Sequence, residues 1–199
     1  RRQRQMCIRD SHKTQVSLTY NSNRIEGSRL TEEQTRYIFE TRTIGFKDEE
    51  AVSVDDIIET SNHFIAFDYL LDTIDEPLSG KLIKELHRIL KTGTADATKA
   101  WFNVGDWKRL PNEVGGTQTV MPQQVDTEIT RLNDRYNSTF DVTFEDIIEY
   151  HYHFEKIHPF QDGNGRIVRF LMLKQMLENN LPLVIVSWDT EDLYRNSLN

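Results

Sequence analysis

The chain has 199 residues, and 32 Asp and Glu against 24 Lys and Arg give it a formal net charge of −8. This acidic balance argues against a nucleic-acid surface, because such binding depends on clustered basic contacts. No apolar run approaches a membrane span, and the length suits a single domain. A lone cysteine, Cys7, fits a reducing compartment. We therefore expect a cytoplasmic protein that binds neither nucleic acid nor membranes.

The first half of the chain shows the spacing of amphipathic helices. Apolar residues recur every three or four positions, which predicts helices over residues 14–26, 31–41, 53–75 and 79–92. Gly27 is a suitable C-terminal stop for the first of these helices. Thr31 and Gln34 resemble a capping box, and Ser53 and Ser79 are suitable N-caps for the two helices that follow them.

Helical spacing disappears between residues 95 and 122. Two adjacent glycines, Gly115 and Gly116, separate the extended runs 109–114 and 117–121, which predicts a β-hairpin.

Helical patterns then return over residues 122–137, 143–157 and 167–177, and a last short helix is predicted to begin at Thr190. The run from 167 to 177 is apolar on nearly every side, which indicates a helix buried inside the domain. His151 and His153 lie two apart and so face different directions, which argues against a shared metal ion and makes His151 a core histidine. The fold class that we predict is all-α, with a helical bundle around a buried central helix and one short hairpin.

One stretch stands out chemically: His158-Pro-Phe160-Gln-Asp162-Gly163-Asn164-Gly165-Arg166-Ile-Val-Arg169. The turn Gly163-Asn164-Gly165 would leave N–H groups exposed at the start of a helix, where phosphate binds well. Arg166 and Arg169 lie three apart, so both can reach anionic oxygens from one face. This part of the stretch predicts a phosphate site.

The same stretch carries groups for proton and metal chemistry. His158 titrates near neutral pH and could take a proton from an attacking hydroxyl. Asp162 is a hard oxygen ligand of the kind that shares Mg²⁺ with phosphates. Together these residues predict phosphoryl or nucleotidyl transfer, whereas the alternative is a helical corner in which His158 and Asp162 merely cap.

This stretch resembles the signature of the Fic family, His-x-Phe-x-Asp/Glu-Gly-Asn-Gly/Lys-Arg-x-x-Arg, at every specified position. The usual reaction of that family moves AMP from ATP to a protein hydroxyl. The resemblance implies ATP and Mg²⁺ as cofactors, with His158 as base and Asp162 as metal ligand. It also implies Gly163, Asn164 and Gly165 as a phosphate cradle, and Arg166 and Arg169 as phosphate ligands, with Arg169 on the γ-phosphate.

The resemblance implies two further aromatic roles and a set of partners. Phe160 would be a buried anchor of the loop, and Tyr194 resembles an aromatic residue that lines the adenine pocket in relatives. The partners would be ATP and a target protein with a Ser, Thr or Tyr hydroxyl. The protein itself is one candidate target, and oligomerisation stays open.

A second match lies near the N-terminus. Ser22-Asn-Arg-Ile-Glu26-Gly27 fits the family's inhibitory pattern, Ser/Thr-x-x-x-Glu-Gly/Asn. The resemblance implies that Glu26 pairs with Arg169 and displaces the γ-phosphate. Residues 1–30 would then be an N-terminal inhibitory segment, and residues 31–199 the Fic core, within one compact unit. The alternative is a solvated glutamate before a helix-ending glycine.

The resemblance also gives the hairpin a role. After a Gly-x-aromatic-basic run such as Gly105-Asp106-Trp107-Lys108, the family has a flap that holds the target. The flap residues would be Gly115, Gly116, Thr117, Gln118, Thr119 and Val120. An edge strand of this kind would bind an extended segment of the target through main-chain hydrogen bonds. Without the resemblance, the hairpin reads as an ordinary surface loop.

Three functions remain open at this point. The leading one is an autoinhibited AMP-transferase. The second keeps the fold but uses another donor, or uses Glu26 to remove AMP from targets. The third is a catalytically silent nucleotide-binding module, which would be expected to lack the histidine or the acid. The presence of His158, Asp162 and Arg169 favours ATP and AMP transfer.

Overall fold

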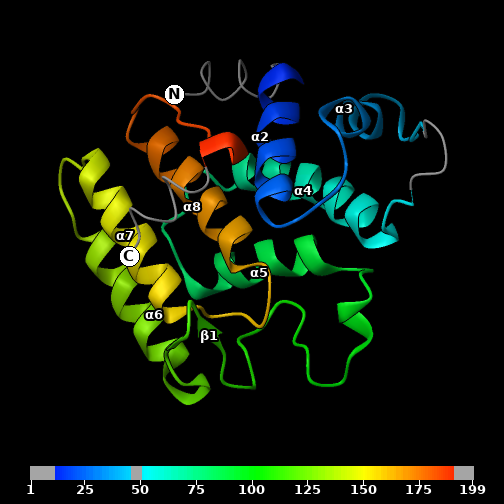
Figure 1. The fold of residues 1–199 in the computed structure, drawn as a ribbon. Coiled ribbons are helices and arrows are strands. Elements are labelled where there is room, and N and C mark those ends of the chain that lie inside the picture. Colours follow the sequence, from blue (N-terminus) through cyan, green and yellow to red (C-terminus); the bar gives the residue numbers. More distant parts are fainter. Residues whose placement is uncertain (1–11, 46–50, 191–199) are drawn as a thin grey trace.

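The computed structural model describes residues 12–45 and 51–190. Within them the fold is all-α apart from one hairpin, as predicted (Figure 1). The α-helices are α2 His12–Ile25, α3 Glu32–Thr41, α4 Val54–Asp72, α5 Gly80–Lys91, α6 Pro122–Asn137, α7 Phe144–Ile157 and α8 Asn164–Glu178. The two strands, β1 Glu113–Val114 and β2 Thr117–Gln118, pair antiparallel. None of the described helices is long and apolar enough to cross a membrane.

Local sequence signals begin these helices where we expected. The Thr31 side chain accepts from the Gln34 N–H, and the Gln34 side chain accepts from the Thr31 N–H, which completes a capping box. Ser53 and Ser79 cap α4 and α5 through their hydroxyls. Thr143 caps α7 in a second box with Asp146. The Thr143 cap sets the start of α7, the helix that leads into the stretch from His158 to Arg169.

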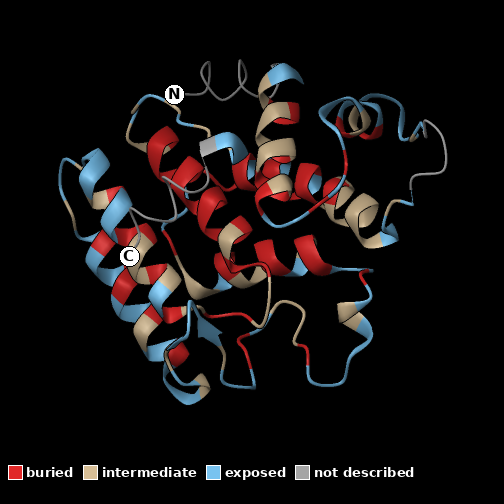
Figure 2. Cartoon of the chain, in the orientation of Figure 1, coloured by how far each residue is buried: buried red, intermediate tan, exposed pale blue. Residues whose placement is uncertain are grey.

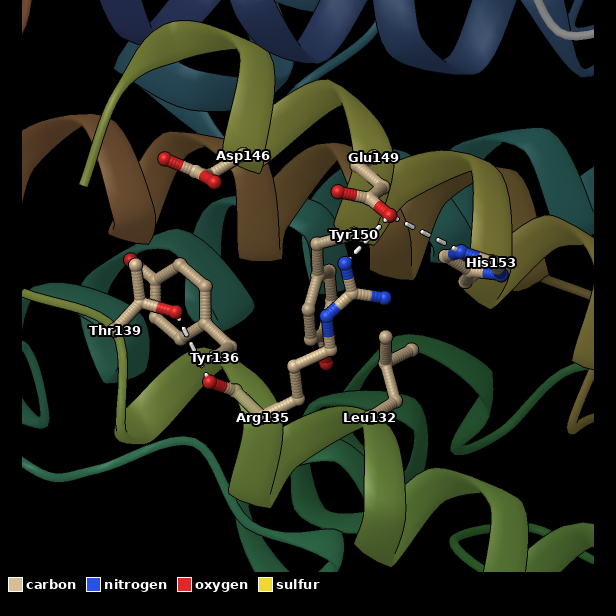
Figure 3. A pocket seen from close by; sticks show the side chains of 8 residues that line it. All are labelled: Leu132, Arg135, Tyr136, Thr139, Asp146, Glu149, Tyr150 and His153. Atoms are coloured by element: carbon tan, nitrogen blue, oxygen red, sulfur yellow. Dashed lines mark hydrogen bonds and ion pairs between the residues drawn. The ribbon is translucent and has the colours of Figure 1, made fainter.

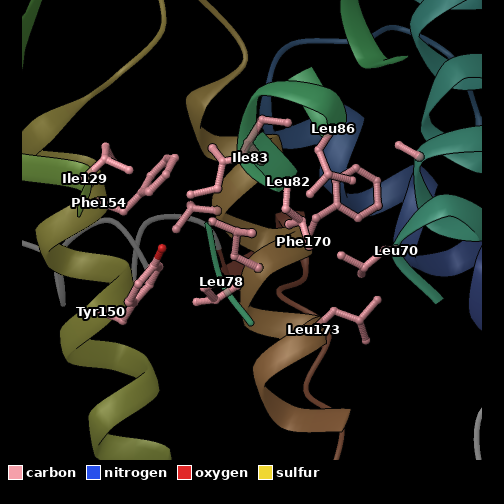
Figure 4. Close-up of a cluster of buried hydrophobic side chains, with 14 of the residues drawn as sticks. Leu70, Leu78, Leu82, Ile83, Leu86, Ile129, Tyr150, Phe154, Phe170 and Leu173 are labelled. Carbon is pink, nitrogen blue, oxygen red and sulfur yellow. The ribbon is translucent and has the colours of Figure 1, made fainter. Parts of the chain in front are cut away.

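The core is built around α8, which lies at the centre of the bundle (Figure 2). All of its residues are buried except Gly165 and Glu178, so it has no solvent face. It packs against α2, α4, α5 and α7. Figure 4 shows apolar side chains of α5, α7 and α8 meeting in one cluster, among them Leu82, Ile83, Leu86, Phe154, Phe170 and Leu173. The buried central helix predicted from the sequence is confirmed, and the motif loop directly precedes it.

One detail differs from the sequence-based expectation. The hairpin is shorter than the predicted runs 109–114 and 117–121, because only two residues on each side pair as strands. The described residues end in a short 3₁₀ helix, Trp188–Thr190, and the helix predicted to begin at Thr190 lies outside them. Tyr194 also lies outside them.

Candidate active site

The motif forms the loop between α7 and α8, and two left-handed residues shape it. His158 caps the C-terminus of α7 at φ 49° and ψ 63°, and its N–H donates to the Phe154 carbonyl at 2.8 Å. Gly163, at φ 83°, precedes the first turn of α8. A side chain at positive φ is uncommon and costs roughly 1–3 kcal/mol, so the His158 backbone is held by its surroundings.

Phe160 anchors this loop in the core. It is fully buried and stacks on His87, with ring centroids 3.9 Å apart and an interplanar angle of 3°. The side chain of Asn164 folds back onto it, accepting from the Phe160 N–H at 2.8 Å and donating to the Phe160 carbonyl at 2.9 Å. Asn164 therefore closes the loop with its side chain, which leaves main-chain N–H groups at the start of α8 for a phosphate.

Truncating the Phe160 side chain should make the protein less stable to unfolding. We expect Phe160→Ala to lower the free energy of unfolding by about 3–5 kcal/mol, because it removes a fully buried ring. Phe140, which is 93% exposed, provides a matched control. Phe140→Ala should stay within about 0.5 kcal/mol of the parent in urea denaturation. Equal losses for the two variants would contradict this role for Phe160.

A carboxylate lies beside the histidine of the motif. The Glu155 Oε2 is 3.4 Å from the His158 Nδ1, one helical turn earlier on α7. Burial would raise the pKa of Glu155, but its close contact with His158 and the charge of Arg169 lower it overall. An ionised Glu155 at this place favours the proton on Nδ1, which leaves Nε2 of a neutral ring as the acceptor. Sequence reasoning missed Glu155, although its position three residues before His158 on a helix was a usable signal.

Asp162 belongs to a network of charged residues from several parts of the chain. Its Oδ2 accepts from the Lys91 Nζ at 2.7 Å and from the Arg166 Nη2 at 3.3 Å. Glu59 on α4 pairs with both of these cations. Burial would raise the pKa of Asp162, but the charges of Arg166 and Lys91 outweigh it and lower the pKa to about 2. The carboxylate is therefore ionised and held in place at neutral pH.

Arg169 is held by the end of α2. The guanidinium Nε donates to the Ser22 hydroxyl at 3.0 Å, and Nη2 donates to the Ser22 carbonyl at 3.0 Å and to the Glu26 Oε1 at 2.6 Å. Arg169 is 8% exposed, so solvent screens this ion pair only in part. Gly27, at φ 92°, ends the turn after α2. Ser22 and Glu26, four residues apart near the N-terminus, thus meet the distant Arg169 in one contact.

The carboxylate of Glu26 lies over the first turn of α8. A Cβ added at Gly165 would clash with the Glu26 Oε1, so the glycine makes room for an anion at this helix N-terminus. The positive end of α8 and the Arg169 guanidinium both favour negative charge there. The position therefore suits a phosphate, and Glu26 is the anion that fills it in this structure.

The hairpin lies beside the motif loop. Its turn residues Gly115 and Gly116 both have positive φ, at 57° and 77°, as a tight two-residue turn requires. Gly115, Gly116, Thr117 and Gln118 are exposed, and Thr119 and Val120 are half-buried. Asn112, just before β1, donates from its side chain to the Phe160 carbonyl at 3.0 Å. The predicted flap therefore adjoins the loop that carries His158.

A small pocket lies apart from this site, between α6 and α7 (Figure 3). Arg135 pairs there with Glu149 at 2.7 Å, and His153 lies 3.6 Å from the same carboxylate. Its volume is about 30 Å³, enough for a water molecule but far below the 300–1,000 Å³ of a typical ligand pocket. His151, two residues before His153 on α7, is 1% exposed and lies in the core, as expected.

The fold is that of a Fic-type helical domain. The model of the Fic/DOC family matches residues 77–176, just over half of the chain, and the chain belongs to this family. It is 31% identical over 190 residues to the protein adenylyltransferase Fic of Drosophila willistoni. That alignment covers 90% of this chain and 35% of the relative, so the chain spans about a third of the length of the relatives that it matches.

Solved structures support the same fold. A Fic-domain-containing signaling protein from Bacteroides thetaiotaomicron superposes with a TM-score of 0.82 at 26% identity, over 98% of this chain and 74% of that one. Fic-1 from C. elegans superposes with a TM-score of 0.78, over 97% of this chain and 56% of that one. At 24% identity, the second likeness bears on the fold alone.

Proposed function

We propose that this protein is an autoinhibited protein adenylyltransferase, which moves AMP from Mg–ATP to a hydroxyl side chain of a target protein. The proposal rests on three features that occur together: His158, the ionised Asp162, and an anion site at the start of α8, which is the space over Gly165 that the Glu26 carboxylate fills. Relatives at about 30% identity are named protein adenylyltransferases, which supports the same reaction here.

The residues fit the two cofactors that this reaction needs. ATP phosphates would occupy the N-terminus of α8, with Gly163 and Gly165 allowing close approach and Arg166 and Arg169 balancing the charge. Asp162 would be the protein's ligand to Mg²⁺, which neutralises charge on the phosphates when bound. Within the described residues no cluster of three or more His, Cys, Asp or Glu side chains could hold a metal alone. The other ligands would therefore come from phosphates and water.

His158 would act on the target hydroxyl. Its ring takes the hydroxyl proton as the oxygen attacks the α-phosphorus, and pyrophosphate leaves. Glu155, 3.4 Å from Nδ1, supports the tautomer in which Nε2 accepts that proton. The six flap residues would hold an extended segment of the target beside this ring. The target hydroxyl belongs to Ser, Thr or Tyr, on another protein or on a copy of this one.

Glu26 would regulate the site. Its carboxylate pairs with Arg169 and fills the anion site over Gly165, so the γ-phosphate of ATP must displace a group of like charge. When the open state is a minor fraction, the apparent affinity for productively bound ATP falls by that fraction. We assign residues 1–30 to this inhibitory segment and 31–199 to the Fic core, and the packing of α2 on α4 and α8 supports a close link between them. Tyr194 stays our prediction for the adenine pocket, and the single cysteine supports a cytoplasmic setting.

The reaction is tested by the position of the label. ATP labelled on the α-phosphate should put label on protein in the presence of Mg²⁺, whereas ATP labelled on the γ-phosphate should not. Pyrophosphate should appear in equal amount. Transfer from the γ-position would show phosphoryl transfer instead. ATP binding without any transfer, even from Glu26→Gly, would favour a silent nucleotide-binding module, and loss of AMP from a pre-modified target would favour removal.

A further inference from the structure

Lys108 is a buried lysine on the segment that leads into the hairpin. It is 3% exposed. Among the described residues, its Nζ donates to neutral acceptors alone: the Asn112 Oδ1 and the Thr119 Oγ1, each at 2.6 Å, and the Ile157 carbonyl at 3.2 Å. Burial lowers the pKa of Lys108 to about 8. A buried cation without a carboxylate is unfavourable for stability, which indicates that its contacts serve another purpose.

The same residue holds the chain on both sides of His158. The Lys108 Nζ donates to the carbonyl of Ile157, and the Lys108 main-chain N–H donates to the carbonyl of Pro159 at 2.8 Å. Between these two points lies His158 with its left-handed backbone. Lys108 therefore fixes one main-chain carbonyl on each side of the residue that must present the base.

The other two acceptors lie at the two sides of the hairpin base. Asn112 precedes β1 and Thr119 follows β2, and the Thr119 N–H donates to the Asn112 carbonyl at 3.2 Å. Asn112 also donates to the Phe160 carbonyl. A single ammonium group thus joins the two sides of the hairpin to the loop that carries the base.

We propose that Lys108 is a positioning residue that sets the distance and orientation between the hairpin flap and His158. The proposal rests on the proposed function, because it assumes that the flap holds the target hydroxyl. Reacting atoms must be brought to about 3–3.5 Å, and a misplacement of about 1 Å can cost about 100-fold in rate. The contacts of Lys108 link the two elements whose relative position decides this distance.

The test compares isosteric substitutions in the Glu26→Gly background. Lys108→Met keeps the stem and the main-chain bond to Pro159 but loses the three Nζ bonds, and Thr119→Val loses one acceptor. We expect Lys108→Met to lower kcat for transfer to a fixed target by roughly 10–100-fold while the affinity for ATP changes by less than about twofold. The variant that combines Lys108→Met with Thr119→Val should be no slower than Lys108→Met alone, because both substitutions break the same set of contacts.

Lys84→Met is the matched control. Lys84 pairs with Asp106 at 2.8 Å and lies over the Trp107 ring, next to the same segment, but it makes no described bond to the motif loop. It should transfer at the parent rate. Three results would overturn the proposal. Lys84→Met could lower the transfer rate as much as Lys108→Met, or Lys108→Met could transfer at the parent rate. The third is that the rate losses of Lys108→Met and Thr119→Val multiply when the two are combined.

Hydrogen exchange tests the contacts of Lys108 independently of whether the protein transfers AMP. Amides of residues 113–118 and of His158 should exchange faster in Lys108→Met than in the parent, and in Lys84→Met they should not. Should the Glu26→Gly parent transfer no label, the proposed function fails, and exchange still decides whether Lys108 joins the hairpin to the loop. Unchanged exchange at both places in Lys108→Met would refute the contact.

Discussion

Replacing Glu26 by glycine should raise the transfer of α-labelled AMP to protein by roughly 5–150-fold, the range of a coupling free energy of about 1–3 kcal/mol. The variant removes the carboxylate that holds Arg169 at 2.6 Å and that fills the space over Gly165. Both the guanidinium and the helix N-terminus then become available to ATP. Initial rates of labelling at equal protein concentration measure the effect.

Two control variants test whether the higher labelling comes from losing the Glu26 carboxylate rather than from any glutamate-to-glycine change. Glu76→Gly alters an exposed glutamate in the turn after α4, and it should label like the wild type. Glu26→Gln keeps the size but not the charge, so it should fall between the wild type and Glu26→Gly. Equal labelling by the wild type and Glu26→Gly would show that Glu26 does not inhibit.

The second large effect is a loss. Adding His158→Ala to Glu26→Gly should lower labelling by about 10²–10⁴-fold, the usual contribution of a general base. ATP affinity should be kept, because the phosphate ligands on α8 are unchanged. His153 lies on the same helix with a side chain that is 42% exposed, so His153→Ala is the matched control and should label like its parent. A double variant that labels as fast as Glu26→Gly would exclude His158 as the base.

Local sequence signals carried much of the fold. Helix starts at Ser53, Ser79 and Thr143 follow from side-chain caps that bond within three residues. The burial of α8 follows from a run without a polar face. The motif is likewise local, since twelve consecutive residues hold its acid, base, glycines and arginines.

Contacts between residues far apart in the sequence could not be predicted from such local signals. Lys91 and Glu59 hold Asp162 and Arg166, but they come from other helices, and a charged residue in an amphipathic helix looks like a solvated one until the partner is known. The burial of Lys108 is hidden for the same reason. The inward turn of Asn164 depends on where Phe160 lies in the folded loop.

If Glu26 controls the site as proposed, Glu26 and the γ-phosphate of ATP compete for Arg169. Calorimetric titration of ATP and ADP into the wild type and Glu26→Gly, with Mg²⁺ present, tests it most directly. We expect the substitution to strengthen the binding of ATP by at least about fivefold, and the binding of ADP, which lacks the γ-phosphate, by less than about twofold. An equal gain for both nucleotides, or no gain for either, would contradict it.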